Sequence, residues 1–463
     1  MTILKILKSY PALFAWAFLC SLPPLFYFYV GEEGACTLTS LEMWQYREFR
    51  HVIMYGAPGL LRPPLFNYTI MSVVMLTGWE NILLASRIVT AISTLATGVM
   101  LAWLAMQLWR DRTIALTAGI LYLVTADVML YRGWLAYADP LYSMFIVFSI
   151  ALVWVACIRA SYQFLLVSVL LAFAAFLTKA LTVYLFLGIS MGIFLTDVNY
   201  RKFLLSPRAF GIYGLGVLLP FFWWKFGSDV PGEDISMLQE IRGKLVTPKI
   251  SQYLIRLFIY PLEYLGRLLP STFFIGYFLL YRRALVLQEP AVRMALLIAL
   301  LNYLPYLIAP EGGIRYVLPT YPFVVLAAAY LVVQKGSPFH VKKWIFWMLL
   351  IGTLCKFIAF PYYQKIYRGE NYKLMASEIL ANYGDYPLYI TNVSSVGLSV
   401  AANIDVMRIN KPVITFPPAD FKDGIVIAYS SNDVSGKLLK IIQIGGKDRV
   451  YLICRGNACG VSK

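Results

Sequence analysis

The segment 32–66, EEGACTLTSLEMWQYREFRHVIMYGAPGLLRPPLF, combines charged and aromatic residues that indicate how this chain folds. It begins with the carboxylate pair Glu32-Glu33 and ends at Arg62-Pro63-Pro64, where the sequence turns apolar again. An apolar run at 11–30 comes directly before it. Ionisable groups beside a membrane are costly unless they are paired or hydrated. The concentration of acids and cations next to an apolar segment therefore indicates a site at a membrane surface.

The composition of the whole chain agrees with a membrane protein. Of its 463 residues, 60% are hydrophobic and 14% are charged, whereas soluble domains carry about 25% charged residues. The formal net charge of +16 reflects 40 Lys and Arg against 24 Asp and Glu. Cytoplasmic loops of membrane proteins accumulate such basic residues. Since the chain has no basic run or soluble basic domain, we do not expect it to bind nucleic acid.

Apolar stretches long enough to cross about 30 Å of hydrocarbon recur along the chain. They predict an α-helical polytopic membrane protein with about eleven transmembrane helices, in a range of roughly nine to thirteen. The stretches are 11–30, 81–107, 113–131, 141–159, 162–178, 180–196, 208–226, 268–281, 291–309, 315–334 and 343–361. The piece 63–78 is apolar but carries polar residues behind two prolines, so we expect a juxtamembrane helix lying in the interface.

The basic residues orient these helices. With Lys5 and Lys8 on the cytoplasmic side, every clearly basic short loop also faces the cytoplasm, as the positive-inside rule requires. The same alternation places a first loop at 31–80 and a second loop at 227–267 on the outer face. It also places 131–140, Lys179 and 310–315 there. The segment 362–463 follows the last predicted span and also lies outside.

The chain changes character after the transmembrane domain, 1–361. Residues 362–463 contain one helical candidate and several short β-rich runs separated by turn residues, which predicts a small C-terminal α/β or α+β domain. The helix is expected at 372–383 and the strands at 387–391, 412–416, 424–429 and 449–454. If this domain lies outside the cytoplasm, Cys454 and Cys459 are close enough in sequence to form a small disulfide loop, and free buried cysteines are the common alternative.

The ionisable residues of the outer face are the candidates for chemistry. Glu32 and Glu33 are either two solvated loop acids or catalytic groups. Asp139, in Ala138-Asp139-Pro140, has the pattern of a helix N-cap, which is compatible with a catalytic role. Several cations are either anchors for lipid headgroups or ligands of an anionic substrate. These are Arg62, Arg132, Lys179 and Arg315, with Arg242 and Lys244 from the second outer loop.

The order of these features resembles the C-type glycosyltransferases. Within that superfamily the chain is most similar to the bacterial aminoarabinose-lipid A transferase and the related protein mannosyltransferases. The resemblance is clearest over residues 62–154 and extends more loosely over the whole chain. The segments that carry it are Arg62-Pro63-Pro64-Leu65, Ala85-Ser86-Arg87-Ile88, Leu108-Trp109-Arg110-Asp111-Arg112 and Tyr137-Ala138-Asp139-Pro140. Walker, Rossmann, G-x-S-x-G and H-E-x-x-H motifs are missing from the sequence.

The resemblance assigns roles to individual residues. The first outer acidic motif of the family falls on Glu32-Glu33, its Lys-Pro on Arg62-Pro63, and its second acidic position on Asp139. The family has Asp-Glu followed shortly by Arg and Tyr, whereas this chain has Gly34-Ala35-Cys36 after the acids. Arginine in place of lysine at 62 keeps the charge but presents a fork of donors instead of a point charge.

The resemblance implies a membrane glycosyltransferase of the bacterial inner membrane, with a cytoplasmic N-terminus and a periplasmic C-terminal domain. It would transfer a sugar, with inversion, from a polyprenyl phosphate such as undecaprenyl phosphate to an envelope lipid, glycan or protein. Glu32, or else Glu33, would be the base, and the cations would hold the donor phosphate. No cofactor is required, although a divalent cation is compatible with two carboxylates. The alternatives are a lipid or solute transporter and a non-catalytic protein that binds polyprenyl lipid.

Overall fold

The chain divides into two compact units in its computed structural model. Unit 1 comprises Met1–Leu22, Thr90–Trp134 and Ala138–Leu354, and unit 2 comprises Pro23–Val89, Leu135–Tyr137 and Cys355–Lys463. The structure describes residues 9–22, 28–60, 62–179, 181–227, 250–281, 288–309, 313–335, 338–364, 366, 371–444 and 448–460.

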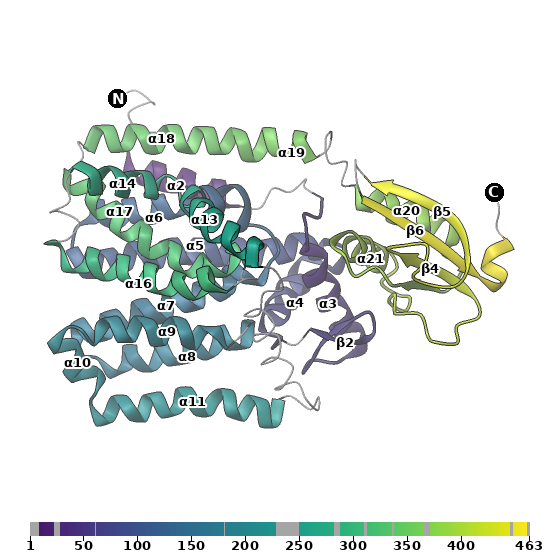
Figure 1. The fold of residues 1–463 in the computed structure, drawn as a ribbon, viewed down its shortest axis with the longest axis horizontal. Helices are drawn as coiled ribbons and strands as arrows, with labels where there is room; N and C mark the ends of the chain where they lie inside the picture. The colour runs from purple at the N-terminus through teal and green to yellow at the C-terminus, as the bar shows by residue number, and fades with distance from the viewer. Residues whose placement is uncertain are drawn as a thin grey trace. The chain divides into compact units, whose positions relative to one another are not determined.

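Unit 1 is helical. Long apolar segments of this kind satisfy their backbone hydrogen bonds internally, as a lipid environment requires. Helices α7, α8 and α9 run side by side (Figure 1), and Trp154 of α7 is buried against Phe194 of α9, with ring centroids 5.5 Å apart. The elements are α2 (Tyr10–Ser21), α5 (Ile82–Trp109, which begins in unit 2), α6 (Arg112–Leu123), the π-helix η2 (Val128–Arg132), α7 (Ala138–Arg159), α8 (Tyr162–Thr178), α9 (Thr182–Phe194), α10 (Val198–Leu204), α11 (Pro207–Gly227), α13 (Ile250–Arg267), α14 (Ser271–Tyr281), α16 (Pro290–Ile308), the 3-10 helix η3 (Ile314–Thr320), α17 (Tyr321–Lys335) and α18 (Pro338–Leu354).

Six helical segments in the described part of the chain are long and apolar enough to cross a membrane. They are Trp79–Trp109, Ala138–Arg159, Pro207–Phe226, Pro290–Ile308, Ile314–Gln334 and Val341–Tyr363. Five other predicted stretches contain shorter apolar helices, namely α2, α6, α8, α9 and α14. The chain is therefore a multi-pass membrane protein, and the count of about eleven spans stays a prediction.

Unit 2 combines helices with a small sheet. The four strands of this sheet lie in the order β3-β4-β6-β5, with β3 parallel to β4 and the other pairs antiparallel. Strands β1 and β2 form a separate antiparallel pair. The unit also contains the first outer loop, so it is larger than the predicted segment 362–463. Its elements are α3 (Glu33–Tyr46), β1 (Val52–Met54), β2 (Ala57–Leu60), α4 (Leu65–Thr77), η1 (Trp79–Asn81), η4 (Cys355–Ala359), α19 (Phe360–Tyr363), α20 (Tyr372–Tyr383), β3 (Leu388–Ile390), α21 (Ser395–Met407), β4 (Gly424–Ala428), β5 (Lys437–Ile444), β6 (Asp448–Arg455) and η6 (Gly456–Gly460).

Most of the expected elements of the C-terminal segment are present. The helix at 372–383 and the strands near 387–391, 424–429 and 449–454 are confirmed. The expected strand 412–416 is wrong, because it contributes only an isolated bridge between Thr415 and Tyr389. Strand β5 and helix α21 were not predicted. The Cys454–Cys459 disulfide is present and joins β6 to η6.

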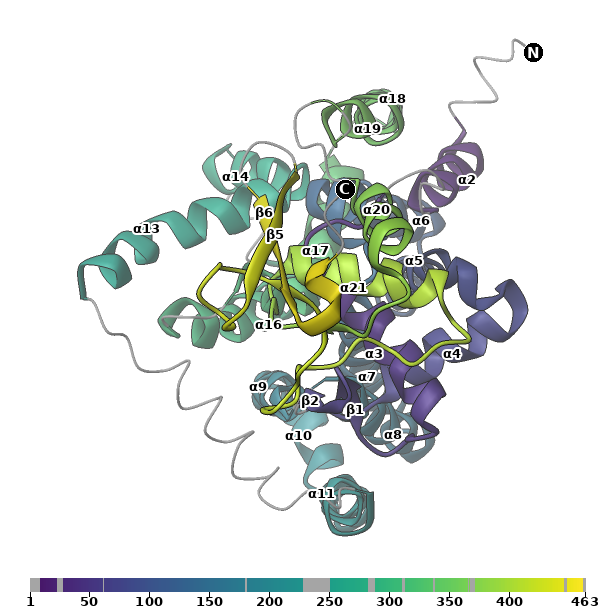
Figure 2. The ribbon, with the colours of Figure 1, turned by 90° about the vertical axis from the view of Figure 1, so that its right-hand side faces the viewer.

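Helix α3 packs closely against α21, which in turn lies beside α20 (Figure 2). A Cβ atom at Gly34 would lie 2.7 Å from the backbone carbon of Leu398 and 2.8 Å from the nitrogen of Ser399. Only glycine allows this approach. The departure from the family pattern at Gly34 therefore has a packing cause within unit 2.

Candidate active site

Glu33, the second acid of the predicted pair, is fully buried in an ion pair with Arg87 of α5. Arg87 Nε donates to Oε1 over 2.8 Å, and Arg87 Nη2 donates to Oε2 over 2.6 Å. The backbone N–H groups of Ala136 and Val30 donate to the same two oxygens over 2.7 and 2.8 Å. Four donors thus surround one carboxylate. This arrangement is the forked, charge-assisted geometry that fixes both partners in place.

Glu32, its neighbour, is exposed and stands at the N-cap position of α3. Its backbone N–H donates to the hydroxyl of Tyr137 over 3.0 Å, and that hydroxyl donates to the carbonyl of Val30 over 3.3 Å. The two acids therefore differ in environment. Glu33 is enclosed, whereas Glu32 is an exposed residue.

Arg62, the predicted phosphate ligand, is partly buried directly before α4. Its Nη2 lies 3.6 Å from the sulfur of Cys36, and its buried Nε has no hydrogen-bond partner among the described residues. A guanidinium with an unused donor is suited to an anionic oxygen. Pro63 and Pro64 are buried behind it and restrict the backbone.

Asp139, the third predicted acid, is buried in the first turn of α7 and pairs with Lys179. Arg315 and Arg132 are the other cations near enough to act electrostatically on its carboxylate. Lys179 also lies over the ring of Tyr316, with its Nζ 4.4 Å from the centroid. Within unit 1 the fold thus gathers one predicted acid with three predicted cations.

Arg132 has a second acidic neighbour that the sequence analysis missed, Asp127. Its Oδ2 lies 3.2 Å from Arg132 Nε, and its Oδ1 lies 2.5 Å from Arg267 Nη1 at the end of α13. Tyr321 donates to Oδ2 over 3.1 Å. Because Asp127 already neutralises part of this cluster, Arg132 is less available to a phosphate than the prediction assumed.

Two buried ionisable residues, Arg87 and Asp127, were thus not among the predicted site residues. Each stands within a stretch interpreted as an apolar span, 81–107 or 113–131. A lone charge in such a stretch is itself a signal of a paired or functional group. Arg242 and Lys244, the remaining predicted ligands, lie outside the described residues.

A further carboxylate of α3, Glu42, is buried, and it forms no ion pair with a cation among the described residues. It accepts hydrogen bonds from the N–H groups of Tyr55 and Gly56, each over 2.9 Å, and so stabilises the tight turn between β1 and β2. Burial raises the pKa of Glu42 to about 8, although these donors lower it. Asp405 of α21 is also buried, and burial raises its pKa to about 7 despite Arg408 nearby.

An apolar cavity of 710 Å³ lies in unit 1. Residues of α13, α14, α16 and α17 line it, among them Tyr264, Ile275, Leu296, Tyr303 and Val324. Such a cavity fits hydrocarbon and provides almost no polar contact. No group of three or more His, Cys, Asp or Glu side chains is arranged to hold a metal ion within the described ranges, so a role for a divalent cation stays a prediction.

Solved structures with a similar fold cover nearly the whole chain. ArnT from Cupriavidus metallidurans bound to undecaprenyl phosphate aligns with 98% of this chain and 99% of its own, at 12% identity and a TM-score of 0.71. The same protein in the apo state aligns over 96% and 97%, at 12% identity and a TM-score of 0.69. The oligosaccharyltransferase AglB from Archaeoglobus fulgidus, solved with an inhibitory peptide and a dolichol-phosphate, aligns over 87% and 64%, at 12% identity and a TM-score of 0.52.

These likenesses show that the chain has the fold of the C-type glycosyltransferases. At this identity they establish the fold alone. No protein-family model matches the sequence, and no curated protein matches it.

Proposed function

We propose that this protein is a membrane glycosyltransferase that moves a hexosyl or pentosyl group from a polyprenyl-phosphate donor to an envelope lipid, glycan or protein. The observation that carries the proposal is the match over 98% of the chain with ArnT, which was solved with undecaprenyl phosphate. The apolar cavity between α13, α14, α16 and α17 supports it, because a polyprenyl chain needs such a surface.

In the proposed reaction the acceptor hydroxyl attacks the anomeric carbon as Glu32 takes its proton. The bond between that carbon and the phosphate oxygen breaks, and polyprenyl phosphate leaves with the electron pair. Arg62 stabilises the negative charge that develops on the phosphate, so a strong general acid is not needed. Displacement from the opposite side inverts the anomeric configuration.

The surroundings of the two acids favour Glu32 as the base. The four donors around Glu33 occupy the lone pairs that a base must offer. Glu33 and Arg87 instead fix the start of α3, which carries Glu32. Asp139, held by Lys179, orients the acceptor or the sugar, and Arg315 adds positive charge beside it.

The Cys454–Cys459 disulfide supports an oxidising location for the C-terminal segment. We therefore place this segment in the periplasm and the protein in the bacterial inner membrane. The N-terminus would then face the cytoplasm, as the basic loops predict.

Transfer of radiolabel from a polyprenyl-phosphate sugar to acceptors in a membrane extract tests the proposal with the purified full chain. Glu32→Gln should lower turnover by about 100-fold or more, because a positioned proton acceptor contributes at least that factor. Asp139→Asn should lower turnover by about the same factor, because a misplaced substrate loses the benefit of orientation. Glu48→Gln is the matched control. Glu48 is partly exposed in the same loop and accepts a hydrogen bond from the N–H of Arg50. Because it has no role in the proposed reaction, its substitution should leave turnover unchanged.

Full turnover by both the Glu32 and the Asp139 variants would overturn the assignment of the site. Movement of the labelled lipid across a vesicle membrane without a new covalent bond would instead identify a transporter. Tight binding of the donor with no transfer to any acceptor would identify a non-catalytic lipid-binding protein.

A further inference from the structure

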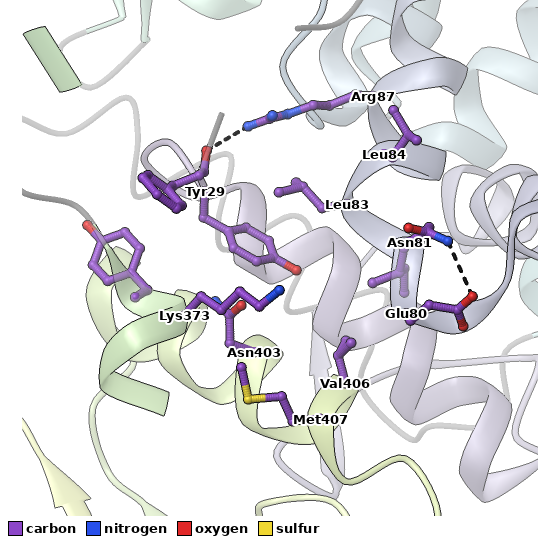
Figure 3. Close-up of a pocket in the computed structure, with 13 residues that line it drawn as sticks. Tyr29, Glu80, Asn81, Leu83, Leu84, Arg87, Lys373, Asn403, Val406 and Met407 are labelled. Atoms are coloured by element: carbon purple, nitrogen blue, oxygen red, sulfur yellow. Dashed lines mark hydrogen bonds between the residues drawn. The ribbon is translucent and has the colours of Figure 1, made fainter. Parts of the chain in front are cut away.

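Unit 2 contains a pocket of 360 Å³ that the proposed reaction does not use. Its walls come from residues 28–29, from η1 and the first turns of α5, from the start of α20 and from the last turns of α21. Figure 3 shows Glu80 and Asn81 on one side, with Lys373 and Asn403 on the other. The volume is at the lower end of the range for ligand sites, about 300–1,000 Å³.

The polar groups of this pocket offer both donors and acceptors. Asn81 Nδ2 donates to the backbone oxygen of Thr77 over 2.7 Å and lies 3.3 Å from Glu80 Oε1. Asn403 Nδ2 donates to the carbonyl of Ser399 over 2.8 Å, which leaves its amide oxygen as an acceptor. The ammonium group of Lys373 has no hydrogen bond or ion pair within the described part of the chain. Planar amides, a carboxylate and an ammonium group together can match several hydroxyls.

The charges of the pocket balance. Glu80 and Lys373 carry opposite charges, and the positive charge of Arg87 is neutralised by Glu33 behind the wall. A phosphate or carboxylate would find no excess of cations here, since anion sites concentrate them. The pocket therefore favours a neutral ligand.

The rest of the wall is aromatic and aliphatic. Tyr29 and Tyr372 are buried, and together with Leu83, Val406 and Met407 they present apolar surface between the polar groups. A ligand that matches this wall carries hydroxyl groups at its edge and C–H groups on its faces. A pyranose ring has this character, because its hydroxyls radiate outward while its two faces expose hydrogens on carbon.

We infer that this pocket binds a neutral sugar unit. On the proposed function, on which this part of the inference rests, that sugar belongs to an acceptor glycan and is a unit other than the one that receives the transferred group. The pocket then acts as a second recognition site for the acceptor and selects glycan-bearing acceptors over bare lipids or peptides.

Arg87, a residue of the pocket wall, also holds Glu33 of the candidate site in place. Arg87 Nη2 donates to the carbonyl of Phe28 over 2.8 Å and to Glu33 over 2.6 Å (Figure 3 shows the bond to the carbonyl). A sugar that orders Phe28 and Tyr29 also orders the loop that leads to Val30 and Glu32. Occupancy of the pocket should therefore lower the KM for the acceptor more than it changes kcat.

Saturation-transfer NMR on the full chain in lipid nanodiscs, which contain no sugar-headed detergent, tests the inference. The probes are glucose, galactose, mannose and N-acetylglucosamine at millimolar concentration, without any polyprenyl lipid. At least one should give a signal, and Glu80→Gln combined with Lys373→Met should weaken its binding about tenfold or more, since two hydrogen-bonding groups are altered. Lys437→Met is the matched control, because Lys437 is an exposed lysine of the same unit that does not line the pocket.

No signal from any of the four sugars, or the same signal from the double variant as from the wild type, would overturn the inference. Displacement of the bound sugar by inorganic phosphate would also overturn it, because it would identify an anion site. The result is independent of the proposed function. If the protein binds a sugar but transfers nothing from a polyprenyl-phosphate donor, the sugar pocket is supported and the glycosyltransferase proposal is contradicted. If it transfers the sugar but the pocket binds none, the glycosyltransferase proposal is supported and the sugar pocket is contradicted.

Discussion

The two ends of helix α3 show two ways to bury a carboxylate. Glu33 at the N-terminal end is surrounded by four donors, two of them from the guanidinium of Arg87. Glu42, nine residues along the helix, accepts hydrogen bonds from the N–H groups of Tyr55 and Gly56 and from no cation in the described segments. Both side chains are fully buried. The two carboxylates are therefore held in different ways. An ion pair and backbone donors hold Glu33, whereas Glu42 has backbone donors and a pKa that burial raises.

Removal of the Arg87 guanidinium should have the largest effect on the stability of the N-terminal end of α3. Arg87→Met leaves Glu33 buried and unpaired, and it should lower the free energy of unfolding by about 3–5 kcal/mol. Denaturant or thermal unfolding of the purified protein in detergent measures the change. Addition of Glu33→Gln to Arg87→Met should restore part of the loss, because it removes the unpaired charge.

Lys440→Met is the control for that substitution. Lys440 pairs with Glu378, and both side chains are exposed, so the unfolding transition should hardly move. If Arg87→Met shifted the unfolding transition no more than Lys440→Met, the Arg87–Glu33 ion pair would stabilise the protein no more than an exposed ion pair does. The conclusion that this pair fixes the N-terminal end of α3 would then be wrong.

A substitution at Gly34 tests whether close packing against α21 helps to fix the N-terminal end of α3, where Glu33 pairs with Arg87. Gly34→Ala places a methyl group against the backbone of Leu398 and Ser399, and it should cost about 1–3 kcal/mol through overpacking. Gly188→Ala in α9 is the control, since a Cβ at Gly188 meets nothing within 4 Å. In a helix interior that change should be neutral or stabilising. Equal effects of the two substitutions would argue against close contact between α3 and α21.

The pH dependence of the free energy of unfolding reports on Glu42, near the C-terminal end of α3. The folded-state pKa of Glu42, about 8, is above its ordinary value of 4.5, so the folded protein binds more protons than the unfolded chain between these values. Stability should therefore fall as pH rises from about 5 to about 8. Asp405, with its pKa raised to about 7, contributes in the same direction below that pH.

Glu42→Gln should reduce this slope and change stability least of the three substitutions at acidic pH, because glutamine resembles the protonated acid. Unfolding midpoints measured at several pH values between 5 and 8 provide the readout. An unchanged slope in the variant would show that Glu42 is already ionised in the folded protein.

Three residues of the candidate site can be chosen from their position in the sequence. Glu32 and Asp139 stand next to predicted spans, and Arg62 stands next to the predicted interfacial helix 63–78. Their roles stay predictions. The pattern does not tell Glu32 from Glu33, because the distinction comes from Arg87 and Ala136, which are distant in sequence. Asp127 is visible in the sequence as a lone acid in an apolar stretch, and Arg132 is only five residues away. Its pairing with Arg267 and its hydrogen bond from Tyr321 come from distant helices, which the sequence pattern does not bring together.

The fold was predictable where local signals are strong. Long apolar stretches and the helix at 372–383 follow from hydropathy and periodicity. Helix α21, with its small residues and its valines, gives no clear helical pattern, and it forms because α3 and α20 pack against it. Strand β5 depends in the same way on its pairing with β6. Contacts between segments far apart in sequence decided what the local pattern left open.

Unit 2 joins segments from the two ends of the chain, and this has a consequence for synthesis. The hydroxyl of Tyr55 donates to the carbonyl of Asn392 over 3.2 Å across a separation of 337 residues. At a synthesis rate of about 5–20 residues per second, the segment with Asn392 is made about 20–70 seconds after the segment with Tyr55. Helix α3 leaves the translocation machinery long before the surface that covers it exists. A chain truncated before α21 would therefore leave α3 exposed to proteases and chaperones. Protection of α3 thus depends on the synthesis of the C-terminal segment.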